Sequence, residues 1–238
     1  MTKIPFLQAT NSVSFPSVDK ALEEPNGLLA AGGALNVNTL INAYEKGIFP
    51  WFEEGSPILW WSPNPRCIFD PRTFSPSKSL RKTISRGGFE IRVNSSFEEV
   101  IRNCKQTRGG NDSTWITESI TEAYIGMHKA GHAHSLECFI NDQLMGGLYG
   151  VSLGNLFFGE SMFYKARDCS KLALAGLMTI MNSHDSKMVD CQLVNGHLLS
   201  LGAKEIPRQT FIKILRDGLN QTPINWAQYN NPLVRLEW

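Results

Sequence analysis

The fold class rests on residues 135–161, which read SLECFINDQLMGGLYGVSLGNLFFGES. Two largely apolar runs, Ser135–Ile140 and Gln143–Val151, flank Asn141-Asp142, a pair of residues that suits a hairpin turn. A second turn signal, Gly154-Asn155, leads into another apolar run. The segment therefore predicts consecutive antiparallel strands.

Helices and further strands surround this segment. Apolar residues at helical spacing, together with capping signals such as Thr117, predict helices over about 38–46, 97–104, 117–129 and 170–182. Short strands are expected near 67–69, 90–93 and 187–193. Strands that alternate with helices beside an antiparallel run indicate an α/β or α+β domain, and we expect the α+β class.

The first sixty residues form a distinct unit that is punctuated by Gly and Pro. Ser62-Pro63-Asn64-Pro65 is typical of a connection between domains, so we expect a small N-terminal domain over 1–62 and a larger domain over 63–238. Three tryptophans fall within residues 51–61. Such a cluster either packs between domains or lines a substrate pocket, and the sequence leaves both interpretations open.

The net charge of +1 hides a segregation along the chain. Residues 1–62 carry three Lys or Arg against six Asp or Glu, residues 63–108 carry ten against four, and residues 109–238 carry ten against twelve. One basic segment suits contact with a polyanion such as RNA or DNA, although chance clustering on a solvated surface explains it equally well. Its basic side chains include Lys78, Arg81, Lys82, Arg86 and Arg92.

Several classes of protein are disfavoured. No stretch approaches the ~18 consecutive apolar residues of a membrane-spanning helix, and Met1–Pro5 does not begin a signal peptide, so we expect a cytoplasmic protein without membrane contact. The five cysteines form no C-x-x-C pair, and His132 and His134 lack further ligands nearby, so no disulfide framework or metal site is expected. The signatures of serine hydrolases, P-loop proteins and dinucleotide-binding proteins do not occur.

Candidate catalytic side chains lie on a late strand. Within Met188–Leu193, alternation places Asp190 and Gln192 on one face and Cys191 on the apolar face. A polar pair among apolar neighbours needs partners if it is buried, so it is either a structural hydrogen-bonded pair or the lining of a cleft. Cys191 is disfavoured as a nucleophile, because a thiol buried among apolar groups keeps a high pKa.

Glu160 follows Phe157-Phe158-Gly159 at the end of a strand, where glycine permits close approach of a ligand. Alone, this glutamate is as readily explained by a surface charge or a helix cap. Together with Asp190 and Gln192 it suggests an acidic pocket, which suits a cationic or amine-bearing substrate.

Eight short motifs follow one another in order along the chain. They are EPNGLLA (24–30), GIFPWF (47–52), WWSP (60–63), TWIT (114–117), GHAHS (131–135), GESMF (159–163), DCQ (190–192) and SLGA (200–203). Together they resemble the bacterial leucyl/phenylalanyl-tRNA–protein transferase family, and the resemblance extends from about Ser14 to Pro207.

This resemblance implies a monomer whose C-terminal domain is similar to the N-acetyltransferase (GNAT) fold. The implied reaction moves Leu or Phe, and less readily Met, from aminoacyl-tRNA to the α-amine of a protein that begins with Arg or Lys. The product then enters the bacterial N-degron pathway. No metal or other cofactor is expected, because an aminoacyl-tRNA is already an activated ester.

The resemblance also implies roles for residues at matching positions. Asp190 receives or relays the amine proton and is oriented with Gln192, while Glu160 positions the acceptor. Trp51 and Trp115 lie near the terminal adenosine and the active site. The amino-acid pocket comprises Leu148, Phe157, Gly159, Leu174, Leu177, Met181 and Val189. The expected tRNA contacts are Lys78, Arg81 and Lys82.

Two other classes stay open. An acetyl-CoA-dependent N-acetyltransferase would share the implied fold, but such enzymes usually carry a glycine-rich pyrophosphate loop, and residues 165–170 contain no glycine. A non-catalytic RNA-binding module would explain the basic segment and the tryptophans. It would leave Asp190, Gln192 and Glu160 without a role.

Overall fold

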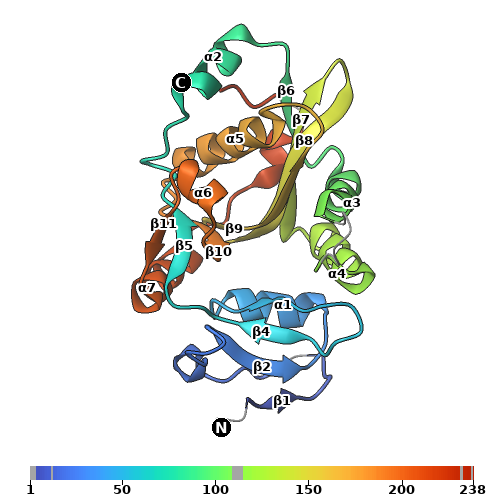
Figure 1. Ribbon diagram of the computed structural model, residues 1–238, viewed down its shortest axis with the longest axis vertical. Coiled ribbons are helices and arrows are strands. Elements are labelled where there is room, and N and C mark those ends of the chain that lie inside the picture. The colour runs from blue at the N-terminus through green and yellow to red at the C-terminus, as the bar shows by residue number, and fades with distance from the viewer. Residues whose placement is uncertain (1–3, 12, 109–114, 231–232, 237) are drawn as a thin grey trace.

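The computed structural model describes residues 4–11, 13–108, 115–230, 233–236 and 238. Met1–Lys3 and Thr114, which enter the sequence analysis, lie outside the described residues. The described chain forms a four-stranded and a seven-stranded sheet. The two sheets lie one beyond the other along the long axis of the molecule, with helices packed against both (Figure 1).

The smaller sheet lies at the N-terminal end and has the strand order β1–β2–β4–β3. Its strands are β1 (Phe6–Leu7), β2 (Leu28–Gly32), β3 (Phe49–Pro50) and β4 (Leu59–Trp61). A 3-10 turn, η1 (Val18–Lys20), and helix α1 (Val37–Tyr44) complete this unit. The Asn36 side chain caps α1 by accepting from the Thr39 N–H, and α1 faces the larger sheet (Figure 1).

The larger sheet has the strand order β11–β5–β10–β9–β8–β7–β6. Its strands are β5 (Arg66–Phe69), β6 (Glu90–Val93), β7 (Ala133–Ile140), β8 (Gln143–Leu153), β9 (Leu156–Tyr164), β10 (Val189–Gln192) and β11 (Lys204–Ile206). The neighbours β9 and β10 are parallel, and the other pairs of this sheet are antiparallel. A parallel pair requires a crossover, which α5 provides between the two strands.

Helices cover both faces of the larger sheet. α5 (Cys169–Ser183) packs on one face, and α3 (Phe97–Arg108) and α4 (Glu118–Lys129) pack on the other (Figure 1). The remaining helical segments are α2 (Lys78–Arg86), α6 (Gly196–Ser200), α7 (Arg208–Leu219) and the 3-10 turn η2 (Trp226–Tyr229). No helix in the described part of the chain is both long and apolar enough to cross a membrane.

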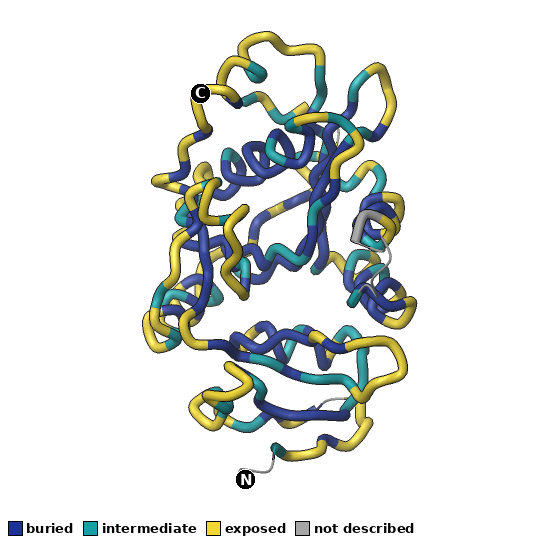
Figure 2. Tube along the Cα trace, viewed as in Figure 1, coloured by how far each residue is buried: buried dark blue, intermediate teal, exposed yellow. Residues whose placement is uncertain are grey.

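One hydrophobic core runs from the smaller sheet into the larger one. It includes Tyr44 of α1, Trp60 of β4, Tyr124 of α4 and Phe158 of β9. A second core lies between α5 and the other face of the larger sheet, and α5 is buried along most of its length (Figure 2). Because the first core spans both sheets, the two units are packed together, and a domain boundary between 1–62 and 63–238 stays a prediction.

The structure confirms the α+β class and most of the expected elements. Positive φ angles at Asn141 and Asp142 form the two-residue turn between β7 and β8. The Thr117 hydroxyl caps α4, as its position in the sequence indicates. α3 continues beyond its expected end at Cys104. No sequence pattern predicts α2, α6, α7 or β11. α2 buries only Leu80 and therefore lacks a wide apolar stripe.

Gly47 connects α1 to β3, and its conformation provides a test of the packing between the two units. Its φ is +74°, and a Cβ added here would lie 2.6 Å from the Phe211 ring of α7. We expect Gly47→Ala to lower the free energy of unfolding by about 3 kcal/mol, because a strained backbone and an overpacked contact add up.

Gly55→Ala is the matched control for this substitution. Gly55 also has a positive φ, +78°, but nothing lies within 4 Å of an added Cβ. We expect a loss of about 1 kcal/mol, which is the backbone contribution alone. Urea denaturation measures both variants, and equal losses would contradict the packing of Gly47 against α7.

Candidate active site

Two β-bulges on neighbouring strands form the candidate site. β9 and β10 pair only at Phe157 with Val189 and at Phe158 with Asp190. Directly beyond these pairs, the register of β9 against β8 shifts at Glu160, and the register of β10 against β5 shifts before Gln192. A bulge redirects the side chains next to it, so both strands depart from regular alternation at the same level of the sheet.

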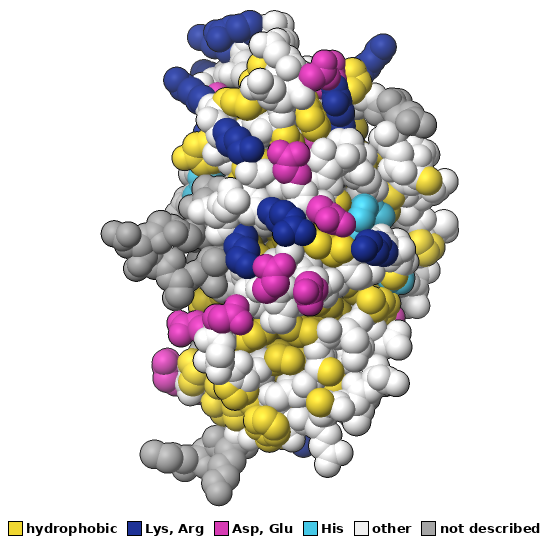
Figure 3. Space-filling view, turned by 90° about the vertical axis from the view of Figure 1, so that its right-hand side faces the viewer, with side chains coloured by type: hydrophobic (Ala, Val, Ile, Leu, Met, Phe, Trp, Pro, Cys, Tyr) yellow, Lys and Arg dark blue, Asp and Glu magenta, His cyan; other side chains and the backbone are white. Residues whose placement is uncertain are grey.

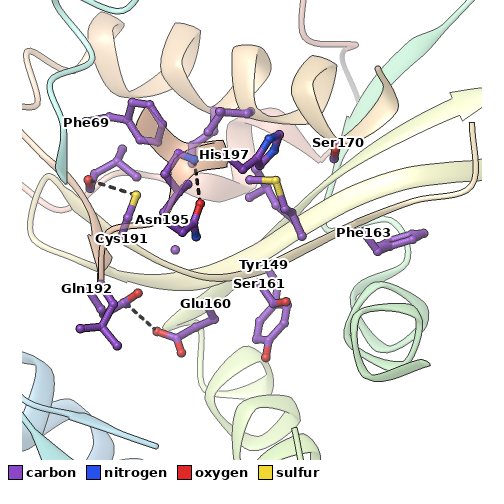
Figure 4. Close-up of a pocket in the computed structure, with 18 of the residues that line it drawn as sticks. Phe69, Tyr149, Glu160, Ser161, Phe163, Ser170, Cys191, Gln192, Asn195 and His197 are labelled. Atoms are coloured by element: carbon purple, nitrogen blue, oxygen red, sulfur yellow. Dashed lines mark hydrogen bonds between the residues drawn. The ribbon is translucent and has the colours of Figure 1, made fainter. Parts of the chain in front are cut away.

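The two bulges bring Glu160 and Gln192 together. Gln192 has a φ of +56°, which is uncommon for a residue other than glycine, asparagine or aspartate. Its Nε2 donates to Oε1 of Glu160 at 3.3 Å, and the two side chains point toward one another in Figure 4. Glu160 and Ser161, which lie at the bulge on β9, both line the same cavity.

Glu160 has two further donors. The Tyr44 hydroxyl of α1 donates to Oε1 at 2.6 Å, and the Tyr124 hydroxyl of α4 donates to Oε2 at 3.0 Å. Burial raises the pKa of Glu160 to about 7, although the hydrogen bonds from the two tyrosines oppose the shift. A carboxyl group with a pKa near the working pH can both accept and return a proton, as a general base must.

Asp190 lies behind the site and is held by Arg66 of β5. The guanidinium donates through Nε to Oδ1 at 2.9 Å and through Nη2 to Oδ2 at 2.8 Å, and both side chains are fully buried. Arg66 also donates to the Gly47 carbonyl at 3.1 Å and lies over the rings of Phe49 and Phe211. Asp190 is therefore neutralised by a fixed cation.

A cavity of about 630 Å³ opens beside Glu160 and Gln192 (Figure 4). Its apolar wall includes Leu148, Met162, Phe163, Leu174, Leu177 and Val189. Its polar side chains include Glu160, Ser161, Ser170, Gln192, Asn195 and His197. Among the described residues that line it there is one carboxylate and neither Lys nor Arg. The cavity is suited to an apolar group that carries an amine at one end, next to the Glu160 carboxylate.

The tryptophan cluster divides between core and cavity. Trp60 is fully buried in the core, and its Nε1 donates to the Gly32 carbonyl at 2.8 Å. Trp51 is 42% exposed and lines the cavity, and its ring lies 5.6 Å from that of Trp61. Trp115 lines the cavity as well. The cluster thus contributes Trp60 to the core and Trp51 to the lining of the cavity.

Comparison with known proteins identifies the family. The sequence matches the family described as leucyl/phenylalanyl-tRNA protein transferase over residues 68–216, and its N-terminal domain over residues 33–64. A leucyl/phenylalanyl-tRNA–protein transferase of Bordetella avium is 48% identical over 220 residues, which cover 89% of this chain and 87% of that protein. The chain belongs to the leucyl/phenylalanyl-tRNA–protein transferase family. It is therefore an enzyme of the aminoacyltransferase class, as the collinear motifs indicate.

Other similar proteins agree with this assignment. The transferase of the same description from Pseudomonas syringae pv. syringae is 46% identical over 218 residues, which cover 91% of this chain and 95% of that protein. Among solved structures, the C-terminal domain (DUF2156) of a putative lysylphosphatidylglycerol synthetase from Agrobacterium fabrum has a TM-score of 0.39 and 9% identity, over 82% of this chain and 62% of that chain. A likeness at that TM-score does not establish a shared fold.

Most of the side chains that the family resemblance implies for the site lie at the cavity. They are Trp51, Trp115, Leu148, Gly159, Glu160, Leu174, Leu177, Val189 and Gln192. Phe157, Met181 and Asp190 are fully buried and are not among the described residues that line it. Phe157 packs against Trp226, with ring centroids 5.6 Å apart, and Met181 belongs to the core beneath α5. The positions of these three residues therefore do not favour direct contact with a substrate.

The predicted tRNA-binding residues lie elsewhere. Lys78, Arg81 and Lys82 are exposed on α2, which packs near α5 at the end of the molecule far from the smaller sheet (Figure 1). On the face shown in Figure 3, Lys and Arg side chains lie over the upper and middle parts, while the lower part is mostly apolar or uncharged. The exposed basic charge of this face is therefore concentrated on the larger unit.

Cys191 and His134 are not placed for chemistry. Cys191 lines the cavity, but burial raises the pKa of its thiol well above the usual range, so it is a poor nucleophile. His134 stacks on Trp226, and burial lowers its pKa to about 3. In the described part of the chain, no three His, Cys, Asp or Glu side chains converge as a metal site requires.

Sequence reasoning missed four residues of the site. Arg66 lies in the basic segment 63–108, and Tyr44 and Tyr124 lie in two of the predicted helices, so no pattern singles them out. A buried arginine needs an anion and a buried phenol needs a partner, so these residue types were a usable signal. The Ser161 hydroxyl is buried in the cavity wall and has no hydrogen-bond partner among the described residues.

The Arg66–Asp190 pair can be tested by removing one charge. We expect Arg66→Met to lower the free energy of unfolding by about 3–5 kcal/mol, because Asp190 is left as an unpaired buried charge. The double variant Arg66→Met with Asp190→Asn removes both charges and should be more stable than Arg66→Met alone.

Arg72 provides the control for this experiment, because it pairs with Asp70 at 2.8 Å and its side chain is 43% exposed. Arg72→Met should change stability little, since exposed pairs are screened by solvent. Urea denaturation compares the variants, and similar losses for Arg66→Met and Arg72→Met would rule out the proposed importance of the buried pair.

Proposed function

We propose that this enzyme transfers Leu or Phe, and less readily Met, from aminoacyl-tRNA to the α-amine of proteins whose first residue is Arg or Lys. The observation that carries the proposal is the cavity, where the Glu160–Gln192 pair adjoins an apolar wall. Family membership supports the class of reaction. The product would be a substrate of the bacterial N-degron pathway.

The apolar wall supports the proposed donor preference. Leu148, Leu174, Leu177 and Val189 are all at least 97% buried and face the cavity from β8, α5 and β10. An uncharged side chain such as Leu, Phe or Met gains burial there, whereas a charged side chain would lose hydration without a partner. Trp51 and Trp115, at the same cavity, are suited to stack on the terminal adenosine.

The charge of the cavity supports the proposed acceptor preference. Glu160 is the carboxylate of the described lining, and no lysine or arginine of the described lining opposes it. A nearby negative charge favours an amine and a cationic Arg or Lys side chain over a neutral one. The segment 1–62, which supplies Trp51, carries an excess of acidic residues as well.

The reaction needs an activated acyl group, a neutral amine and a proton acceptor. The ester of aminoacyl-tRNA supplies the first, so no cofactor is invoked. A C–N bond forms as the ester C–O bond breaks, and the proton lost by the amine ends on the ribose oxygen that leaves. The α-amine has an ordinary pKa of about 7.7–8.0, so part of it is neutral at neutral pH. Holding the amine in line with the carbonyl supplies much of the rate.

The positions of the two carboxylates favour a revised division of roles. The family resemblance assigns the amine proton to Asp190, but both Asp190 oxygens accept from Arg66 and the side chain lies behind the cavity wall. Glu160 faces the cavity and has a pKa of about 7, raised by burial. We therefore assign proton transfer to Glu160. Asp190 orients Gln192 by accepting its backbone N–H at 3.0 Å.

Recognition of tRNA would use the larger unit. Lys78, Arg81 and Lys82 are exposed together on α2, where they can neutralise phosphates.

The mixed seven-stranded sheet, with one parallel pair at the site, supports the expected likeness to the N-acetyltransferase (GNAT) fold. We expect the enzyme to act as a monomer in the cytoplasm, where aminoacyl-tRNA is made.

A transfer assay tests the reaction, the donor and the acceptor together. Radiolabelled Leu-tRNA is offered with two model proteins that differ only in their first residue, Arg or Ala. We expect label on the Arg protein alone, because the cavity favours a cationic acceptor. No transfer from Leu-, Phe- or Met-tRNA would refute the proposal. Binding of acetyl-CoA, or RNA binding without turnover, would then favour the other two classes.

Replacement of Glu160 tests its assignment as proton acceptor. We expect Glu160→Gln to lower kcat by about 10²–10⁴-fold, the usual contribution of general base catalysis. Glu137→Gln is the matched control, because Glu137 is a fully buried carboxylate on β7 that accepts from Ser135 and does not line the cavity. Single-turnover transfer per folded molecule is measured for both, and equal effects would contradict a specific role of Glu160.

A further inference from the structure

Tyr44 and Tyr124 converge on Glu160 from two different helices. Each oxygen of the carboxylate accepts from its own phenol, Oε1 from Tyr44 at 2.6 Å and Oε2 from Tyr124 at 3.0 Å. The two phenol oxygens also lie in direct contact with one another. Both tyrosine side chains are fully buried. The two phenols and the carboxylate therefore form a compact polar cluster at the edge of the cavity.

This arrangement fixes the carboxylate in orientation as well as position. A carboxylate held by one donor can rotate about its last bond, whereas donors on both oxygens define the plane of the group. α1 and α4 pack against each other, and Phe158, next to the bulge, packs on Tyr44 with ring centroids 5.1 Å apart. The donors are thus supported by the core and not by solvent-exposed loops.

The phenols also act on the charge of Glu160. Burial favours the neutral carboxyl group, and Asp190 of β10 acts in the same direction, while Arg66 of β5 and the two phenols favour the carboxylate. Gln192 of β10 adds a neutral donor. Burial raises the pKa of both phenols well above the usual range, so they stay protonated and remain donors at neutral pH.

We propose that Tyr44 and Tyr124 are positioning residues for the transfer reaction, which hold Glu160 as a carboxylate and direct it toward the acceptor amine. Neither phenol lines the cavity among the described residues, so both act through Glu160. This role rests on the proposed function, in which Glu160 accepts the amine proton. It also makes a residue of the N-terminal unit part of the catalytic arrangement.

The pH dependence of transfer tests this role in Tyr44→Phe and Tyr124→Phe. Each variant keeps the aromatic ring and removes one donor from the carboxylate. The pKa of Glu160 should therefore rise, and the acidic limb of kcat/KM should move up by about one to two pH units. Activity should fall about tenfold or more near neutral pH and recover at higher pH. Circular dichroism establishes that each variant is folded, and either variant alone suffices for the test.

Two further variants make the result specific. Tyr229→Phe removes a phenol that hydrogen-bonds to His184 outside the cavity, and its pH profile should match that of the wild type. Glu160→Gln should remove the Glu160 limb and leave only the ionisation of the acceptor amine. The carboxyl infrared band that disappears in Glu160→Gln belongs to Glu160, and its titration should shift upward in both tyrosine variants.

The outcomes separate this role from the proposed function. An acidic limb or infrared titration that stays in place in the tyrosine variants, or turnover that falls equally at every pH, would overturn the positioning role. Failure of the proposed function looks different, because the wild-type enzyme would then transfer nothing at any pH.

Discussion

The buried ion pair between Arg66 and Asp190 is the constraint on which the site depends. A guanidinium without solvent needs partners for its donors. Arg66 finds them on β10 of the larger sheet and at Gly47, in the turn between α1 and β3 of the N-terminal unit. None of these elements can shift without leaving a charge or a donor unpaired. Asp190 also accepts the Gln192 N–H, so the pair fixes the residue from which the bulge on β10 starts. The geometry of the cavity is thereby set from the protein interior.

The same region places two carboxylates in contrasting surroundings. Asp190 faces a permanent cation, whereas Glu160 faces phenols and an amide, which are neutral. Asp190 therefore has a structural charge, and its field makes ionisation of Glu160 less favourable. Pairs of acidic groups whose environments differ in this way commonly divide the work of a site between anchoring and proton transfer. The two bulges are what allow such different environments on adjacent strands.

Sequence patterns predict features that depend on residues close together in the chain. They do not predict contacts between residues that are far apart in the chain. The hairpin at Asn141-Asp142 and the cap at Thr117 follow from local turn and capping chemistry, and the structure contains both. Alternation also predicts that Asp190 and Gln192 share one face and that Cys191 lies on the other. Asp190 and Gln192 contact Arg66 and Glu160, whereas Cys191 packs with the core beneath α5. Arg66 and Asp190 are 124 positions apart, so no local pattern pairs them. Family motifs located Glu160 and Gln192, but not the donors around them.

The two phenols that contact Glu160 come from segments that precede it in the chain, so their cluster is complete only after β9 has been made. Tyr44 and Glu160 are 116 positions apart, and a ribosome makes the α1 segment long before β9 emerges. Until both are folded together, the carboxylate that faces the substrate lacks one of its donors. A chain that has been made only as far as β8 already contains both phenols but not the carboxylate that they contact. On the proposed assignment, the cluster around Glu160 needs both units, because Tyr44 comes from α1 and Tyr124 from α4.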